Sequence, residues 1–96
     1  MNPPPDVIRR RFRIHGRVQG VGFRAWCWQT AARLHLEGTV RNNPDGTVDV
    51  EAAGARDAVE ALAQALTHGP RHARVDGVAE LPPGTHPLPG EFRVVG

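Results

Sequence analysis

The sequence contains no serine, no lysine and no tyrosine, so its 12 basic side chains are all arginine. These absences exclude a serine nucleophile, a Schiff-base lysine, a Walker-type lysine and a tyrosine general acid. The single cysteine, Cys27, excludes an internal disulfide and a cysteine-rich zinc site. No apolar run approaches the ~20 residues that a membrane-spanning helix needs, and the proline-rich start lacks the basic and apolar parts of a secretory signal. We therefore expect a cytoplasmic protein that does not enter a membrane.

The composition predicts one small globular domain. The chain has 96 residues, of which 40% are hydrophobic and 23% are charged, and its net charge is +2. One domain is the natural number at this length. We expect residues 1–7 to form a disordered proline-rich lead and residues 8–96 to form the domain, and we expect it to be a monomer. A charge of +2 is compatible with small anionic substrates as well as with nucleic acid.

Hydrophobic periodicity predicts the order of helices and strands. Residues 8–14 alternate between apolar and basic side chains, as in a strand with one buried face. Apolar side chains then recur at helical spacing from residue 22 to residue 35 and again from residue 55 to residue 66. The turn Asn43-Pro44-Asp45-Gly46 joins two alternating runs into a hairpin. Further strands are expected over residues 38–42, 47–53, 72–81 (with Gly77 as a weak point or bulge) and 92–95.

This order, β-α-β-β-α-β with one more strand, predicts a ferredoxin-like α/β sandwich. In this fold two helices cover one face of a mostly antiparallel sheet of four or five strands. The open face of the first strand would carry Arg9, Arg11 and Arg13, and the open face of the second hairpin strand would carry Asp49 and Glu51. Opposite charges on adjacent strands attract each other, so we expect these two strands to be neighbours.

Three glycines within residues 16–22 indicate a loop between the first strand and the first helix. Main-chain N–H groups at such a junction have no helical partner and can bind an anion, which the helix dipole also favours. Arg24 in the first helical turn could bind two phosphate oxygens from the side. A plain flexible connection is the other interpretation. The pattern Gly20-Val21-Gly22-Phe23-Arg24-Ala25 also matches a dinucleotide-binding motif, but the hairpin breaks the parallel sheet that this motif needs.

No side chain stands out as the nucleophile for a bound phosphate. Serine is absent, Cys27 falls on the apolar stripe of the first helix, and the five histidines have no metal-ligand spacing. Water is then the default nucleophile. Asn42 is a candidate to orient it, because an amide both donates and accepts hydrogen bonds. The other interpretation of Asn42 is a turn residue that caps Asn43-Pro44.

Two segments resemble the signatures of the acylphosphatases: residues 16–24, and Gly38-Thr39-Val40-Arg41-Asn42 through Val48. The resemblance implies the ferredoxin-like fold and the hydrolysis of acyl phosphates to a carboxylate and inorganic phosphate, without metal or cofactor. Phosphate, or sulfate as its analogue, would bind at the same place. Arg24 matches the family's phosphate-binding arginine, and Asn42 matches the asparagine that holds the attacking water. The phosphate-binding loop corresponds to Gly16, Arg17, Val18, Gln19, Gly20, Val21, Gly22 and the amide of Phe23.

The chain departs from the family pattern at Thr39, where many members have tryptophan, and at Ala25, where an aromatic residue often follows the arginine. Both changes bear on substrate preference more than on activity. One alternative is a non-catalytic module that binds RNA or another anion, but Phe12 shares a face with Ile8 and Ile14 and is not expected to stack on bases. Another alternative is a relative that handles carbamoyl phosphate, like the N-terminal part of hydrogenase-maturation carbamoyltransferases.

Overall fold

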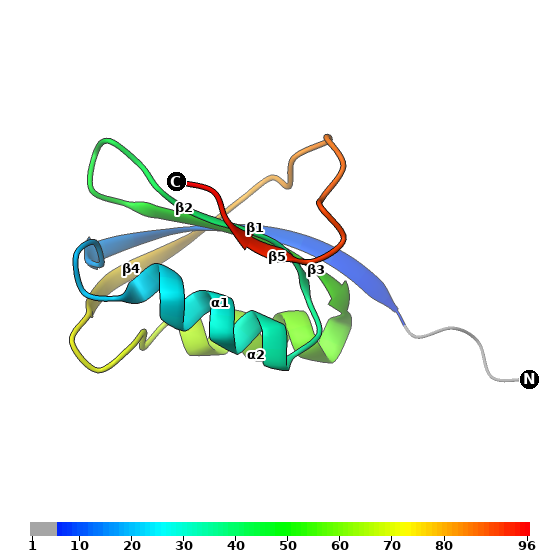
Figure 1. The fold of residues 1–96 in the computed structure, drawn as a ribbon, viewed down its shortest axis with the longest axis horizontal. Coiled ribbons are helices and arrows are strands. Elements are labelled where there is room, and N and C mark those ends of the chain that lie inside the picture. Colours follow the sequence, from blue (N-terminus) through cyan, green and yellow to red (C-terminus); the bar gives the residue numbers. More distant parts are fainter. Residues whose placement is uncertain (1–5) are drawn as a thin grey trace, which may run out of the picture.

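The computed structural model describes residues 6–96, which form five strands and two helices in the order β-α-β-β-α-β-β (Figure 1). The predicted order is confirmed, and each helix lies within two residues of its predicted limits. The elements are β1 (Val7–Arg17), α1 (Phe23–Arg33), β2 (Glu37–Asn42), β3 (Val48–Ala55), α2 (Arg56–Leu66), β4 (Arg74–Leu81) and β5 (Phe92–Val94). Neither helix in this part of the chain is long and apolar enough to cross a membrane.

The strands form one sheet in the order β4-β1-β3-β2-β5. Neighbouring strands are antiparallel except for β2 and β5, which run parallel. Both helices lie on the same face of the sheet, while the loop between β4 and β5 extends from the other face (Figure 1). This arrangement is the predicted ferredoxin-like sandwich with a fifth strand added beside β2.

The expected charge pairing between β1 and β3 is confirmed. The Nε atom of Arg9 lies 2.7 Å from Glu51, and Asp49 accepts hydrogen bonds from Arg13 at 2.8 Å and from Arg11 at 2.9 Å. Both carboxylates are nearly buried on the open face of the sheet. Their burial is tolerated because several donors satisfy their oxygens.

The hydrophobic core lies between the sheet and the two helices. The first helix contributes the stripe predicted from its spacing, in which Phe23, Cys27 and Ala31 are buried and Trp26 packs edge-on against Phe23 with ring centroids 5.3 Å apart. Burial raises the pKa of the Cys27 thiol to about 12, so this side chain behaves as a small apolar group. The second helix and the sheet contribute Val59, Leu62, Leu66, Phe12, Ile14, Val40, Val48 and Val50.

The structure corrects two predicted boundaries. The first strand starts at Val7, which pairs with Ala55, so Val7 is part of the domain and not of the lead. Residues 1–5, the remainder of that lead except Asp6, lie outside the described residues. The same strand ends at Arg17 and not before Gly16, because Gly16 pairs with Val75 of β4. The loop to α1 is therefore shorter than predicted and covers residues 18–22.

Gly16 has a specific reason to be glycine. It lies at a register shift where β4 contains an extra residue, next to the predicted weak point at Gly77. Its φ angle is 129°, and a Cβ atom there would overlap the main-chain oxygen of Arg74. The close approach of β4 therefore depends on the missing side chain.

Candidate active site

A cavity of about 320 Å³ opens at the N-terminus of α1. Three separate segments form it: the loop 18–22 with the first turn of α1, the end of β2, and β5. Both predicted catalytic residues, Arg24 and Asn42, line this cavity. The other lining residues are Val18, Gly20, Gly22, Phe23, Ala25 and Val94.

The glycines of the loop set the main-chain direction at the cavity. Gly20 and Gly22 have φ angles of 74° and 78°, a left-handed conformation that strongly favours glycine. Gly22 is the N-cap of α1 and makes no side-chain capping hydrogen bond. The first N–H groups of the helix are therefore available to a ligand, and the helix dipole adds partial positive charge at the same place. The first turn itself carries the positively charged Arg24.

Arg24 is half-buried at the edge of the cavity. One terminal nitrogen of its guanidinium donates a hydrogen bond of 2.5 Å to the main-chain oxygen of Gly96. The same oxygen accepts a hydrogen bond of 3.1 Å from the main-chain N–H of Asn42. Gly96 thus connects the arginine on α1 with the end of β2, and it holds the guanidinium beside the cavity.

The side chain of Asn42 carries an unusual buried atom. Its Oδ1 is buried and has no hydrogen-bond partner within residues 6–96. A buried acceptor without a partner costs about 1–3 kcal/mol, so each such atom calls for a structural or functional explanation. A water molecule or a ligand O–H group at this position would satisfy it.

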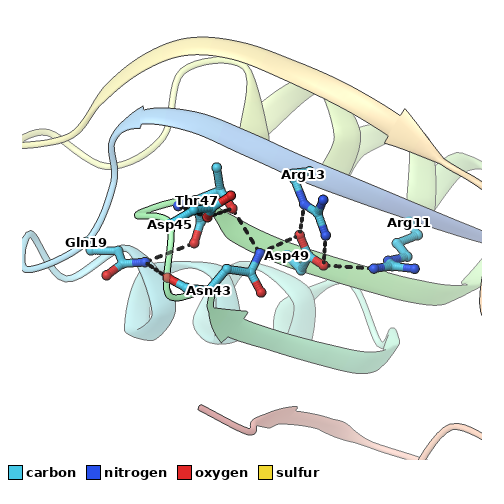
Figure 2. A network of polar contacts seen from close by, with 7 residues as sticks. All are labelled: Arg11, Arg13, Gln19, Asn43, Asp45, Thr47 and Asp49. Atoms are coloured by element: carbon cyan, nitrogen blue, oxygen red, sulfur yellow. Dashed lines mark hydrogen bonds and ion pairs between the residues drawn. The ribbon is translucent and has the colours of Figure 1, made fainter.

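Gln19 does not line the cavity but fastens the loop to the β2–β3 hairpin (Figure 2). Its side-chain Nε2 donates to the main-chain oxygens of Asn43 at 2.8 Å and Thr47 at 2.9 Å. Asn43 directly follows the candidate Asn42. We call these two hydrogen bonds the Gln19 clamp, and they fix the distance between the loop and the residue that would orient water.

A polar network extends from the clamp across the open face of the sheet (Figure 2). The side-chain Nδ2 of Asn43 donates to the Thr47 hydroxyl at 2.9 Å and to Asp49 at 2.8 Å. Burial by itself raises the pKa of Asp49, but hydrogen bonds from Arg13, Arg11 and Asn43 outweigh burial and hold that pKa well below its usual range. Asp49 therefore stays ionised and orients the amide of Asn43.

The predicted loop residues have different places in the structure. Gly16 and Arg17 belong to β1, and Val21 packs against the core. The sequence indicated Gln19 only as a member of the loop, and it gave no sign that Arg24 would contact Gly96 or that Gln19 would contact Thr47. These contacts are made to main-chain oxygens, for which the residue type gives no signal.

Within residues 6–96, the histidines and acidic residues do not gather into a metal site. Within the described part of the chain, no three His, Cys, Asp or Glu side chains lie close enough together to hold a metal ion.

Comparison with known proteins places the chain in one family. The family model described as acylphosphatase matches residues 10–93. An acylphosphatase of Nitratidesulfovibrio vulgaris strain DP4 is 49% identical over 88 residues, which are 90% of this chain and 88% of that protein. The structure of an acylphosphatase from Coxiella burnetii superposes with a TM-score of 0.80 at 33% identity and covers 93% of each chain.

A longer protein contains a similar domain. Full-length HypF, solved in a phosphate- and nucleotide-bound form, superposes with a TM-score of 0.85 at 28% identity. The match covers 100% of this chain and 13% of that protein. The model match over most of the chain, together with curated relatives that carry the name of an enzyme that hydrolyses acyl phosphates, leads to one conclusion. The chain belongs to the acylphosphatase family.

Proposed function

We propose that this protein hydrolyses the carboxyl–phosphate bond of acyl phosphates in the cavity at the N-terminus of α1. One observation carries the proposal: a single cavity contains Arg24, the glycine loop and Asn42, whose Oδ1 is buried without a partner. The charged groups there suit an anion, and the unpaired acceptor suits a water molecule.

The phosphoryl group binds first to the loop and the arginine. Main-chain N–H groups from Gly20 to Phe23 donate to its oxygens, and the guanidinium of Arg24 donates from the side. The bond from Arg24 to Gly96 occupies one terminal nitrogen, and among the described residues this is its one side-chain bond. The other donors of the fork remain for phosphate.

Asn42 then orients the attacking water. The amide Oδ1 accepts a hydrogen bond from one O–H group of the water, which directs the lone pair of the water oxygen at phosphorus. As the new P–O bond forms, the bond between phosphorus and the acyl oxygen breaks, and its electron pair leaves on the carboxylate. One proton of the water passes to an oxygen of the phosphoryl group, and the other stays on the attacking oxygen, which becomes a hydroxyl of the phosphate product. A carboxylate is a good leaving group, so positioning and charge stabilisation supply most of the catalysis.

Of the two other interpretations from the sequence, the RNA-binding module has less support. An RNA-binding module would use the open sheet face, but Arg9, Arg11 and Arg13 are engaged by Glu51 and Asp49 there, and Phe12 is buried. Carbamoyl phosphate presents the same phosphoryl group to the cavity and belongs among the substrates to be assayed. A monomer in the cytoplasm remains the prediction from the sequence.

The test is phosphate release from benzoyl phosphate in the presence of a chelator. Arg24→Ala should lower kcat/KM by at least about 100-fold, and Arg24→Lys should not restore it, because an ammonium group cannot donate in a fork. Arg33→Ala is the matched control, since Arg33 is an exposed residue in the last turn of the same helix. It should leave kcat/KM unchanged.

Asn42→Ala separates binding from catalysis. This variant keeps the main-chain hydrogen bond to Gly96, so inorganic phosphate should inhibit it as it inhibits the wild type while kcat falls at least about 100-fold. Wild-type kcat in Asn42→Ala, or loss of wild-type activity with the chelator, would contradict the proposal.

A further inference from the structure

A second, apolar groove lies directly beside the proposed catalytic cavity. It has a volume of about 470 Å³ and runs between α1 and β5, which are neighbours in the structure (Figure 1). Ala25 and Val94 line both the groove and the catalytic cavity, so the two spaces adjoin each other. We call this space the acyl groove; its other lining residues are Trp28, Glu91, Phe92 and Arg93.

The walls of the acyl groove are apolar and unusually exposed. Trp28 is 45% exposed and Val94 is 46% exposed, although both are large hydrophobic residues. The two charged residues at the rim, Glu91 and Arg93, pair with each other at 2.9 Å. The groove therefore exposes apolar surface that a ligand could cover, and the opposite charges of Glu91 and Arg93 at its rim neutralise each other.

The tryptophan is held in place before any ligand binds. Its indole Nε1 donates a hydrogen bond of 3.0 Å to the main-chain oxygen of Phe92. This bond fixes the ring of Trp28 against β5 and leaves part of the ring open to solvent. A ring fixed in advance loses little conformational freedom when a ligand covers it.

The groove is within reach of a phosphoryl group held by Arg24. Arg24 and Trp28 are four residues apart in α1, so they lie on the same side of the helix and about 6 Å apart along its axis. A substrate whose phosphoryl group occupies the catalytic cavity has its acyl carbon only one bridging anhydride oxygen away from phosphorus. The shared residues Ala25 and Val94 mark the direction in which that group can extend.

We propose that the acyl groove binds the hydrocarbon part of the substrate, so that the enzyme prefers acyl phosphates with an aromatic or longer aliphatic acyl group. The inference rests on the proposed function, because it assumes that phosphate occupies the neighbouring cavity. Acetyl phosphate is too short to cover Trp28. An acyl group with a second carboxylate finds no unpaired cation at the rim, because Arg93 is already neutralised by Glu91.

The first test compares kcat/KM for benzoyl, acetyl and succinyl phosphate. The wild type should use benzoyl phosphate best. Trp28→Ala should lower the ratio of benzoyl to acetyl kcat/KM by about tenfold, as expected when one face of an aromatic ring loses its apolar contact. Trp28→Phe lacks the hydrogen bond to Phe92 but keeps an aromatic face, so it should retain most of the preference.

A near-isosteric pair of substitutions avoids any loosening of β5. Val94→Thr adds a hydroxyl to the groove and should lower the benzoyl-to-acetyl ratio by about threefold. Val95→Thr is the matched control, because Val95 is exposed to a similar extent but lines a different cavity together with Arg41. It should leave the ratio unchanged.

Inhibition by phosphonates, which are not hydrolysed, tests binding in the acyl groove separately from the hydrolysis of acyl phosphates. Benzylphosphonate should inhibit the wild type more strongly than methylphosphonate, and Val94→Thr should reduce that difference. Unchanged ratios in Trp28→Ala and Val94→Thr, in an active enzyme, would overturn the acyl groove and leave the proposed function intact. Absence of hydrolysis for all three acyl phosphates would overturn the proposed function itself.

Discussion

Substituting Gln19 by alanine should separate the positioning of the loop from the binding of phosphate. The Gln19 clamp holds the loop to Asn43 and Thr47 of the hairpin that carries Asn42 (Figure 2). Without it, phosphate can still bind to the loop N–H groups and Arg24, which belong to one continuous segment. The water held by Asn42 would then no longer be aligned with phosphorus.

The structure allows the size of two effects of Gln19→Ala to be worked out: the loss in stability and the loss in kcat. The oxygen of Asn43 also accepts from Gly46, and the oxygen of Thr47 also accepts from Asn43, so neither is left without a donor. The loss in stability is then the net value of two hydrogen bonds, about 2 kcal/mol. A misplacement of about 1 Å between reacting groups costs about 100-fold in rate. We expect Gln19→Ala to lower kcat by about 10- to 100-fold and to change the inhibition constant of phosphate by less than about threefold.

Steady-state kinetics with benzoyl phosphate, phosphate inhibition and urea unfolding provide the assay. Gln19→Glu is nearly isosteric but presents a carboxylate to two carbonyl oxygens, so it should be at least as impaired. Gln29→Ala, at an exposed position of α1, is the control and should match the wild type. A Gln19→Ala enzyme that is less stable by about 2 kcal/mol yet keeps wild-type kcat would refute this reasoning, because the clamp would then be only structural.

Three further predictions follow from the packing. The pKa of Asp49 is lower in the folded protein than its unfolded value of about 3.9, so ionised Asp49 stabilises the fold above that value, and this stability is lost as the pH falls through the folded pKa. Asp49→Asn should therefore be less stable than the wild type at pH 7 and should lose less stability on acidification. Urea unfolding from pH 7 to pH 2 would measure both differences. Cys27 should react with a thiol reagent at pH 8 only after unfolding, because it is buried with a pKa raised to about 12, and the absorbance of the released reagent measures this. Gly38→Ala should cost at least about 3 kcal/mol in urea unfolding, because its φ is 148° and a Cβ would overlap the oxygen of Glu51, whereas Gly46→Ala, with open space at φ 93°, should cost about 1 kcal/mol.

Local patterns in the sequence predicted most of the fold. The alternation in residues 8–14 and the Asn43-Pro44-Asp45-Gly46 turn depend on neighbouring residues alone, and both are confirmed. Opposite charges even identified which strands are adjacent. The parallel pairing of β5 with β2 was not predicted, because nothing in the irregular segment 82–91 specifies where the chain returns to the sheet.

The extension of β1 to Arg17 was missed for a similar reason. Glycine usually interrupts a strand, but at Gly16 the absence of a side chain allows β4 to approach closely. The partner strand lies about 60 residues away in the sequence. A local pattern cannot show which glycines serve such a non-local contact.

The candidate site also contains residues that the sequence pointed to and contacts that only the folded structure reveals. Motif resemblance made Arg24 and Asn42 candidates, and the structure brings both to one cavity with part of the loop. The Gln19 clamp and the Gly96 contact depend on main-chain oxygens that come together only in the folded chain. The acyl groove likewise combines α1 with a strand more than 60 residues further along.

A crystal structure determined after soaking in inorganic phosphate would show whether the cavity at the N-terminus of α1 binds the phosphoryl group. A tetrahedral anion should occupy the cavity, within hydrogen-bond distance of the main-chain N–H groups from Gly20 to Phe23 and of the Arg24 guanidinium. Asn42 Oδ1 should face a water molecule near phosphorus. An empty loop at saturating phosphate, with Arg24 bonded to Gly96 alone, would contradict the proposed function.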